Sequence, residues 1–124
     1  MSANNISVSS ERRCFLLPKS QFSTGTSQPS YAVFSQIAKN ILNLSTREND
    51  INTKMSDVLT VRADSYYNIK YVRDGNSLTR YVDNTLVDTI NVDFLDNYND
   101  WTFSMIRWSA TGSSKMKNVK IKAL

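Results

Sequence analysis

The sequence predicts an all-β protein built as an antiparallel β-sandwich, and three observations support that prediction. Between Tyr67 and Tyr71 apolar and polar residues alternate, which is the period-two pattern of a strand with one buried face. The pairs Asp74-Gly75 and Asp83-Asn84 interrupt this alternation with residues typical of two-residue hairpin turns. No segment combines two strands with a crossover helix. Several short strands joined by turns are typical of two sheets packed face to face.

Length and composition indicate one domain. The chain has 124 residues, enough for a core of its own, and we expect a flexible N-terminal segment over residues 1–10 before a single β-sandwich domain over residues 11–124. The net charge of +4 permits binding to an acidic polymer without requiring it. No apolar run reaches the roughly 20 residues of a membrane helix, and the N-terminus lacks a signal-peptide pattern. We therefore expect a soluble chain with no membrane insertion.

The first half of the chain carries the weaker strand signals. A strand is expected from Arg12 to Leu17, ended by Pro18 because proline donates no hydrogen bond to a ladder. Residues 31–44 fit two short strands around a turn at residues 38–40, and they also fit one helical face. We favour the strands because the later segments have β patterns. A further strand and the approach to the next one are expected at residues 51–55 and 58–62.

The second half carries the stronger signals. From Tyr66 three strands are expected to form a meander, and its Asp74-Gly75 turn is of the type that has positive φ at both central positions. The inward residues of the third strand are expected to be Leu86, Ile90, Val92 and Phe94. Two more strands are expected, from Trp101 to Trp108 and from Lys115 to Leu124, the latter with a bulge at Lys117-Asn118.

This second half resembles a known family. The stretch YYNIKYVRDGNSLTRYVDNTLV resembles the hairpins of concanavalin A-like lectin and laminin-G-like jelly rolls, and the ending SKMKNVKIKAL is similar to their closing strand. The resemblance covers about Tyr66 to Leu124. Asn84 stands where the family usually has Gly, and Tyr66-Tyr67 stands where it usually has Trp.

The resemblance implies a concanavalin A-like jelly roll, whose members most often bind glycans on a concave sheet or at loop tips. Such modules occur in bacteriophage tail and baseplate proteins, in microbial adhesins and beside polysaccharide-degrading enzymes. It favours a non-catalytic carbohydrate-binding or adhesion module at a virion or cell surface, or otherwise extracellular, as part of a larger protein. The alternative is a structural module of a virion or surface protein that forms a homo-oligomer or larger assembly and has no glycan ligand.

The residue types that most catalysis needs are absent from the sequence. Retaining glycanases require two carboxyl groups about 5 Å apart, whereas the two glutamates, Glu11 and Glu48, are far apart in the sequence. The sequence has no His that could act as a base to activate the thiol of Cys14. Cys14 is the single cysteine, so it has no partner for an internal disulfide. We therefore expect that the chain is not an enzyme.

Aromatic and polar residues of the second half are candidates for glycan contact. An aromatic ring can stack on the apolar face of a sugar while nearby polar groups fix the hydroxyls. By alternation Tyr66 lies on the face opposite Tyr67, and Tyr81 lies on the face opposite Arg80. Trp101 and Trp108 are equally typical of core residues. The candidate glycan-binding residues are Tyr66, Tyr81, Tyr98, Arg80, Arg107, Asn97 and Trp108.

Two charged groups of residues each have two interpretations. Asp93, Asp96 and Asp100 lie in one loop and offer the oxygen ligands that Ca²⁺ prefers, so Ca²⁺ is the one cofactor that the sequence suggests. We favour a solvated acidic loop because the spacing matches no calcium motif. Four C-terminal lysines suggest either a nucleic-acid stripe or the charged outer face of a terminal strand, and we favour the latter. These lysines are Lys115, Lys117, Lys120 and Lys122.

Overall fold

The fold is all-β. The structure is a computed structural model that describes the backbone of residues 2–4, 11–22, 28–62, 65–108 and 113–115, and the side chains of residues 13–22, 28–62 and 66–104. Within these residues the regular elements are strands and two short 3-10 helices, η1 (Lys19–Gln21) and η2 (Leu95–Asn97). The strands are β1 (Ser2–Asn4), β2 (Glu11–Pro18), β3 (Ala32–Ala38), β4 (Ile41–Glu48), β5 (Ile51–Thr60), β6 (Ser65–Tyr66), β7 (Ile69–Asp74), β8 (Ser77–Val82), β9 (Thr85–Asn91), β10 (Trp101–Trp108) and β11 (Ser113–Lys115).

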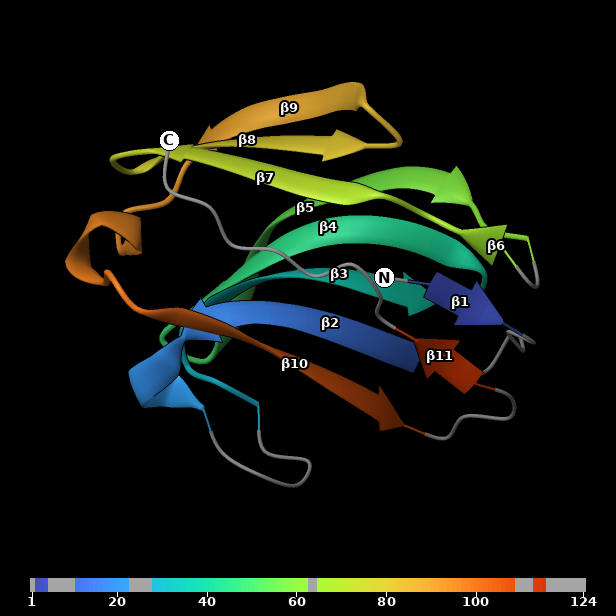
Figure 1. The fold of residues 1–124 in the computed structure, drawn as a ribbon, viewed down its shortest axis with the longest axis horizontal. Coiled ribbons are helices and arrows are strands. Elements are labelled where there is room, and N and C mark those ends of the chain that lie inside the picture. The colour runs from blue at the N-terminus through green and yellow to red at the C-terminus, as the bar shows by residue number, and fades with distance from the viewer. Residues whose placement is uncertain (1, 5–10, 23–27, 63–64, 109–112, 116–124) are drawn as a thin grey trace.

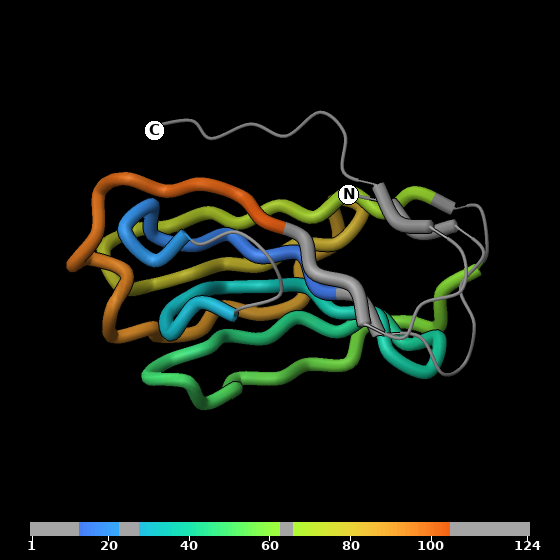
Figure 2. Tube along the Cα trace, turned by 90° about the horizontal axis from the view of Figure 1, so that it is seen from below, coloured from blue at the N-terminus to red at the C-terminus, as the bar shows by residue number. Residues whose placement is uncertain are grey.

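The strands form antiparallel sheets, which Figure 1 shows with β7, β8 and β9 in the upper part of the view and β10 at the lower edge. A five-stranded sheet has the order β10-β2-β3-β4-β5, and a second sheet has the order β7-β8-β9. A small third sheet has the order β11-β1-β6. Hairpins join most neighbouring strands, so the chain runs back and forth between two ends of the molecule (Figure 2).

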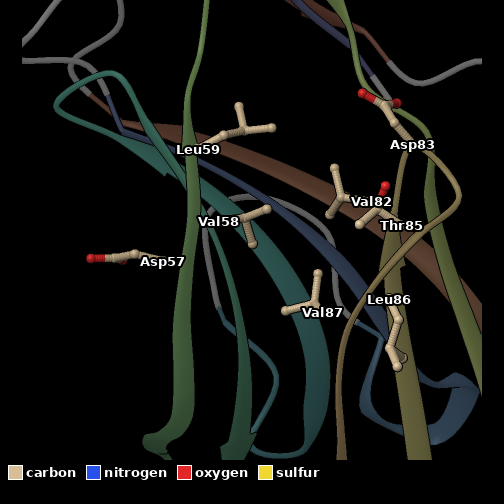
Figure 3. A pocket seen from close by; sticks show the side chains of 8 residues that line it. All are labelled: Asp57, Val58, Leu59, Val82, Asp83, Thr85, Leu86 and Val87. Carbon is tan, nitrogen blue, oxygen red and sulfur yellow. The ribbon is translucent and has the colours of Figure 1, made fainter.

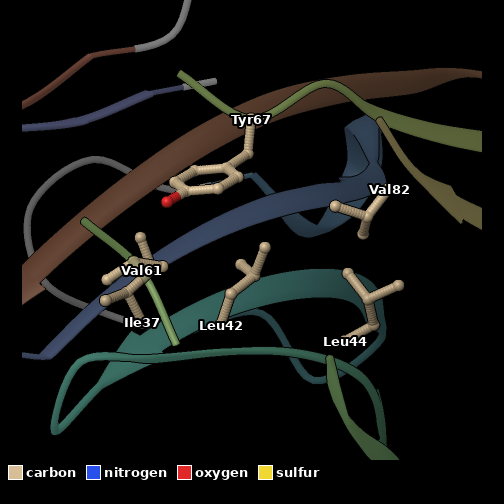
Figure 4. Packing of buried hydrophobic residues seen from close by; sticks show 6 residues of the cluster. All are labelled: Ile37, Leu42, Leu44, Val61, Tyr67 and Val82. Carbon is tan, nitrogen blue, oxygen red and sulfur yellow. The ribbon is translucent and has the colours of Figure 1, made fainter. Parts of the chain in front are cut away.

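Apolar side chains from the two larger sheets pack against each other in two clusters. The first contains Ile37, Leu42, Leu44, Val61, Tyr67 and Val82 and is shown in Figure 4. The second contains Val33, Leu78, Val92, Phe94 and Leu95. Both clusters combine residues of the five-stranded sheet with residues of the β7–β8–β9 sheet. The arrangement is therefore consistent with the β-sandwich that the sequence predicts.

The other face of the five-stranded sheet is also buried in part. Phe15 and Phe34 are opposite each other in the β2–β3 register, and each is 1% exposed. Their ring centroids are 5.2 Å apart, and the guanidinium of Arg13 lies 5.3 Å from the centroid of the Phe34 ring. Because residues alternate between faces, this cluster lies on the side of the sheet opposite Leu16 and Val33.

Residues 31–44 form strands β3 and β4, so the helical alternative is wrong and the two-strand prediction is confirmed. The turn between them is Lys39-Asn40, with φ of 51° and 63°. The Asp83-Asn84 turn is confirmed as well, with φ of 50° and 64°. Pairs with positive φ at both positions match the right-handed twist of the flanking strands, so these hairpins form without glycine.

The turn between β7 and β8 differs from the prediction by one residue. Asp74 pairs with Ser77, which leaves Gly75-Asn76 as the turn, and only Gly75 has positive φ, at 59°. A two-residue turn with glycine first and positive φ only there is the second common hairpin type. The residues before this turn keep their predicted alternation, but the shift changes which residues of β7 and β8 pair with each other.

Three further predictions need correction. Residues 51–60 form one continuous strand, β5, whose register against β4 shifts at two points. Residues 2–4 form β1, although a flexible segment was expected over residues 1–10. Leu86 was expected to point inward, but its side chain is 58% exposed. The predicted strand from Lys115 to Leu124, with its bulge at Lys117-Asn118, lies outside the described residues except for Lys115, which ends β11.

A bulge in β9 explains the exposure of Leu86. Arg80 pairs with Asp88 while Tyr81 pairs with Leu86, so Val87 is an extra residue without a partner in β8. An extra residue reverses the phase of the alternation. Leu86 therefore shares the outward face of Tyr81, and Val87 packs against the first apolar cluster instead.

Candidate functional site

The outward face of the β7–β8–β9 sheet is the candidate site, and we call it the outer face. The register of the hairpins places three cross-strand rows on it, since residues that pair across strands share a face. The rows are Lys70–Tyr81–Leu86, Val72–Thr79–Thr89 and Asp74–Ser77–Asn91. All nine side chains are exposed or half-buried. The outer face thus combines one aromatic ring with hydroxyl, amide and charged groups.

Lys70 and Tyr81 form the most specific contact on the outer face. The Lys70 Nζ atom lies 4.5 Å from the centroid of the Tyr81 ring, which is cation–π distance. Among the described residues, no carboxylate lies within ion-pair distance of Lys70. An exposed ammonium group therefore covers the ring that sequence analysis singled out.

Polar side chains continue from this pair across the sheet. The hydroxyl oxygens of Thr79 and Thr89 are 3.1 Å apart and share a hydrogen bond. Asn91 donates a hydrogen bond from its amide to the Asp93 carboxylate, which holds that amide group in place. Hydroxyl and amide groups beside an aromatic ring are the groups that bind sugar hydroxyls in proteins.

Arg80 lies on the opposite, inner face of the same strand. Its side chain is 0% exposed, and it makes a bidentate ion pair in which Nε is 2.7 Å and Nη2 is 2.6 Å from the two carboxylate oxygens of Asp88. Arg80 was a candidate for glycan contact. Its burial and its pairing with Asp88 remove it from the outer face, so it is not available to a ligand there.

The Arg80–Asp88 pair also links the two larger sheets. Ser56 of β5 donates a hydrogen bond of 3.0 Å to Asp88, and Arg80 donates one of 3.3 Å to the same Ser56 hydroxyl. The hydrogen bonds from Arg80, followed by the one from Ser56, lower the pKa of Asp88, although burial opposes them. The Arg80 Nη1 atom and the Tyr71 hydroxyl are buried, and neither has a hydrogen-bond partner among the residues that the structure describes.

Cys14 faces this polar interior and is not an activated thiol. Burial raises its pKa to about 12, while a hydrogen bond with Ser35 lowers it by less. A thiol with that pKa is protonated at neutral pH and is a poor nucleophile. Burial also raises the pKa of Tyr71.

An open groove runs between β5 and β9, beside the outer face. Its volume is about 470 Å³, and its lining consists of Asp57, Val58, Leu59, Val82, Asp83, Thr85, Leu86 and Val87. Figure 3 shows Val58 and Val87 pointing into the space between the strands, whereas the Asp57 carboxylate points away from it. In the described sheets β5 and β9 are end strands, so an edge of each sheet borders this mainly apolar groove.

The remaining aromatic candidates belong to other parts of the molecule. Tyr66 lies in β6 and is 45% exposed. Tyr98 follows η2 and is half-buried, with ring centroids 6.3 Å from Tyr31 and 6.2 Å from Trp101. The Trp101 indole donates a hydrogen bond of 3.0 Å to the Tyr98 carbonyl. Tyr66, Tyr81 and Tyr98 thus lie on three separate elements.

The other candidates for glycan contact lie near η2 or outside the described side chains. Asn97 is exposed at the end of η2, next to the half-buried Tyr98. Arg73 holds this region in place, because its guanidinium donates hydrogen bonds of 3.0 Å to the carbonyls of both Leu95 and Tyr98. Arg107 and Trp108 belong to β10, and their side chains lie outside the described residues. The side chains of the four C-terminal lysines do so as well.

The three aspartates proposed as Ca²⁺ ligands do not form a common site. Asp93 accepts a hydrogen bond from Asn91, and an Asp96 carboxylate oxygen lies 3.8 Å from Arg73 Nη2. Asp100 is exposed, and its carbonyl accepts a hydrogen bond of 2.8 Å from Lys19. Within the described part of the chain, no group of three acidic, Cys or His side chains could hold a metal ion.

Sequence reasoning identified Tyr81 but missed its neighbours on the outer face. Lys70, Thr79 and Thr89 share that face because β7 and β9 pair with β8 in the register that the two turns set. The signal was present for Lys70, which alternates with Ile69 and Tyr71. For Thr89, alternation with Ile90 indicates the face but not the pairing with Thr79, because the bulge at Val87 cannot be read from the alternation alone.

No protein-family model matches the chain. No curated protein matches it either. Among the described elements, no helix is long and apolar enough to cross a membrane.

Proposed function

We propose that this domain is a non-catalytic carbohydrate-binding or adhesion module with a concanavalin A-like jelly-roll fold. In this proposal its ligand is a glycan on a cell surface or outside cells, and the domain is part of a larger protein such as a phage tail, baseplate or cell-surface component. The resemblance of Tyr66 to Leu124 to lectin hairpins supports it, and so does the β7–β8–β9 meander built from that stretch.

The observation that carries the proposal is the composition of the outer face. Tyr81 supplies a ring, and the Thr79–Thr89 pair and Asn91 supply hydroxyl and amide groups on the same face. A flat face of this kind binds a sugar weakly at each site. Several copies in one particle would raise the overall affinity through effective concentration.

A glycan array probed with the purified domain tests this function. Tyr81→Ala should lower binding of any glycan hit at least about tenfold, since stacking on the ring is lost, and Thr79→Ala should lower it less. Phe22→Ala is the matched control, because Phe22 is an exposed aromatic residue at the end of η1 rather than on the outer face. Hits that survive Tyr81→Ala would place the glycan elsewhere, and an array without hits would contradict the proposal.

A second candidate function is assembly, and exposed apolar side chains on an end strand favour it. Ile51 and Met55 of β5 are 62% and 59% exposed, and the groove with Leu86 lies along the same strand. In the described structure β5 is the end strand of its sheet. Exposed apolar residues on such a strand are suited to contact with a second copy of the chain.

Light-scattering mass measurement over a range of protein concentrations tests assembly. A mass above that of one chain, reduced to one chain by Ile51→Lys, would support it. Phe22→Lys is the control, because Phe22 is 48% exposed but lies beside η1 rather than on β5. A mass of one chain at every concentration would contradict it.

A further inference from the structure

The Lys70–Tyr81 contact bears on which sugars the outer face can take, and the inference rests on the proposed carbohydrate-binding function. The ammonium group lies 4.5 Å from the ring centroid, so it occupies the place over the ring that a stacked sugar would need. A sugar that stacks on Tyr81 must displace Lys70. Displacement removes this cation–π contact, which is weak at an exposed site.

A neutral sugar and an acidic sugar differ in how they offset this cost. When a neutral sugar displaces the Lys70 ammonium from the ring, the ammonium is solvated by water and gains no charged partner. An acidic sugar can pair its carboxylate with the ammonium while its ring occupies Tyr81, and a charge-assisted hydrogen bond is stronger than a neutral one. The described acidic groups do not compete, because none lies within ion-pair distance of Lys70.

The nearest described acidic groups are committed elsewhere or lie at the far side of the face. Asp83 accepts a hydrogen bond of 2.8 Å from the Asn68 backbone, and Asp88 is paired with Arg80 on the inner face. Asp74 and Asp93 lie at the opposite end of the outer face, in or beside the row with Asn91. Within the three rows of the outer face, Lys70 in the Tyr81 row is therefore the cation and Asp74 in the Asn91 row is the carboxylate, while the exposed Asp83 lies in the turn beyond the Tyr81 row.

We infer that the outer face binds an acidic polysaccharide, with a carboxylate-bearing sugar stacked on Tyr81 and its carboxylate on Lys70. The Thr79–Thr89 pair and Asn91 lie along the same strands and bind hydroxyls of the adjoining residues of the polymer.

Affinity electrophoresis in gels that contain either polygalacturonate or dextran tests the inference, because the two polymers differ in charge. The wild-type domain should be retarded by polygalacturonate and bind dextran at least about tenfold more weakly. Lys70→Gln should weaken polygalacturonate binding about tenfold, and it should tighten dextran binding by about two- to fivefold, because a neutral sugar then no longer displaces the ammonium from the ring. Raising the salt from about 0.1 M to about 1 M should weaken polygalacturonate binding, because the Debye length falls from about 10 Å to about 3 Å.

Lys39→Gln is the matched control. Lys39 is an exposed residue of the β3–β4 turn, and its replacement changes the net charge by the same amount. An equal loss in the Lys39→Gln and Lys70→Gln variants would show attraction to net charge and would overturn the inference. Dextran sulfate in a third gel separates carboxylate recognition from recognition of any anion, and tighter binding to it than to polygalacturonate would also overturn the inference.

The result also separates this inference from the function on which it rests. Binding of dextran or of neutral array glycans that depends on Tyr81 but not on Lys70 would leave the carbohydrate-binding function standing and overturn the acidic ligand. Absence of binding to every polymer and to the array would overturn both.

Discussion

The two faces of the β7–β8–β9 sheet are built by the same strands and have opposite character. Arg80 and Tyr81 are neighbours in β8, yet the first is 0% exposed and paired with Asp88, while the second lies on the outer face under Lys70. Strand geometry sends successive side chains to opposite faces. Adjacent residues of β8 can therefore have different roles, stability for Arg80 and the proposed ligand binding for Tyr81. Substitutions at the two positions can separate these roles.

The inner face depends on a polar pair inside an apolar sandwich. Leu78 and Val82, on either side of Arg80 in the same row, are 2% and 3% exposed. Burying a guanidinium is costly unless carboxylates and hydroxyls accept its hydrogen bonds, and among the described residues Asp88 and Ser56 do so for all but Nη1. The outer face contains no fully buried charge, so substitutions there should cost little stability.

The largest expected effect is the loss of stability in Arg80→Ala. Removing one member of a buried ion pair leaves the other as an unpaired buried charge, which typically lowers the free energy of unfolding by about 3–5 kcal/mol. Urea unfolding followed by circular dichroism measures the change, with Thr79→Ala on the outer face as the control, expected within about 0.5 kcal/mol of wild type. Arg80→Met combined with Asp88→Leu should recover most of the loss, because it removes both charges and retains volume. A loss below about 1 kcal/mol in Arg80→Ala would show that the pair is not needed.

Acidification tests the same inner pair without removing atoms. The hydrogen bonds from Arg80 lower the pKa of Asp88, so its contribution to stability is present above the pKa of an unfolded aspartate, about 3.9, and is lost as the pH falls through the lower folded value. The difference in unfolding free energy between wild type and Asp88→Asn should therefore be constant near neutral pH and shrink below about pH 4. Urea unfolding at several pH values measures it, and a difference that stays constant to low pH would show that Asp88 does not titrate with folding.

On the outer face, a substitution should affect ligand binding more than stability. Tyr81→Ala should lower the free energy of unfolding by less than about 1 kcal/mol, since the ring is half-buried and packs under Lys70 rather than in a core cluster. The same variant should lose glycan binding. Urea unfolding and glycan binding, measured on one preparation of the variant, give the change in stability and the change in affinity. A stability loss as large as that of Arg80→Ala would mean that the outer face is part of the core.

Much of the fold could be predicted because its strands alternate strictly where one face is buried. Alternation placed Tyr81 on the face opposite Arg80, and this is confirmed, because Arg80 is buried in one row with Leu78 and Val82 while Tyr81 is not. The same row shows the limit of the method. Arg80 looked like a ligand contact because charge favours the surface, and its partner Asp88 comes into register only through the bulge at Val87, which no spacing reveals.

Of the outer face, only Tyr81 could be predicted from the sequence, because the register between strands was not known. Alternation assigns a residue to a face, but it does not say which strands lie beside it or in what register. Lys70 reaches Tyr81 because the Gly75-Asn76 turn sets the β7–β8 register, one residue from the turn predicted. Alternation and the turn residues predicted the meander, and the resemblance to lectin hairpins carried no information on the residues of the outer face.

The smallest expected effect concerns the turn that holds β9 against β8. Asn84 has φ of 64°, a left-handed conformation that costs a residue with a Cβ roughly 1–2 kcal/mol, and that Asn tolerates better than most. Asn84→Ala should therefore lower stability by about 1 kcal/mol, whereas Asn84→Gly, the residue that the lectin hairpins usually carry there, should be neutral or slightly stabilising. Urea unfolding of the two variants measures the difference. Because the turn sets the register that puts Leu86 beside Tyr81 on the outer face, and Gly keeps that turn, Asn84→Gly should leave glycan binding unchanged. A loss of binding in a variant with wild-type stability would mean that the turn itself contacts the ligand, and the outer face would then extend to its tip.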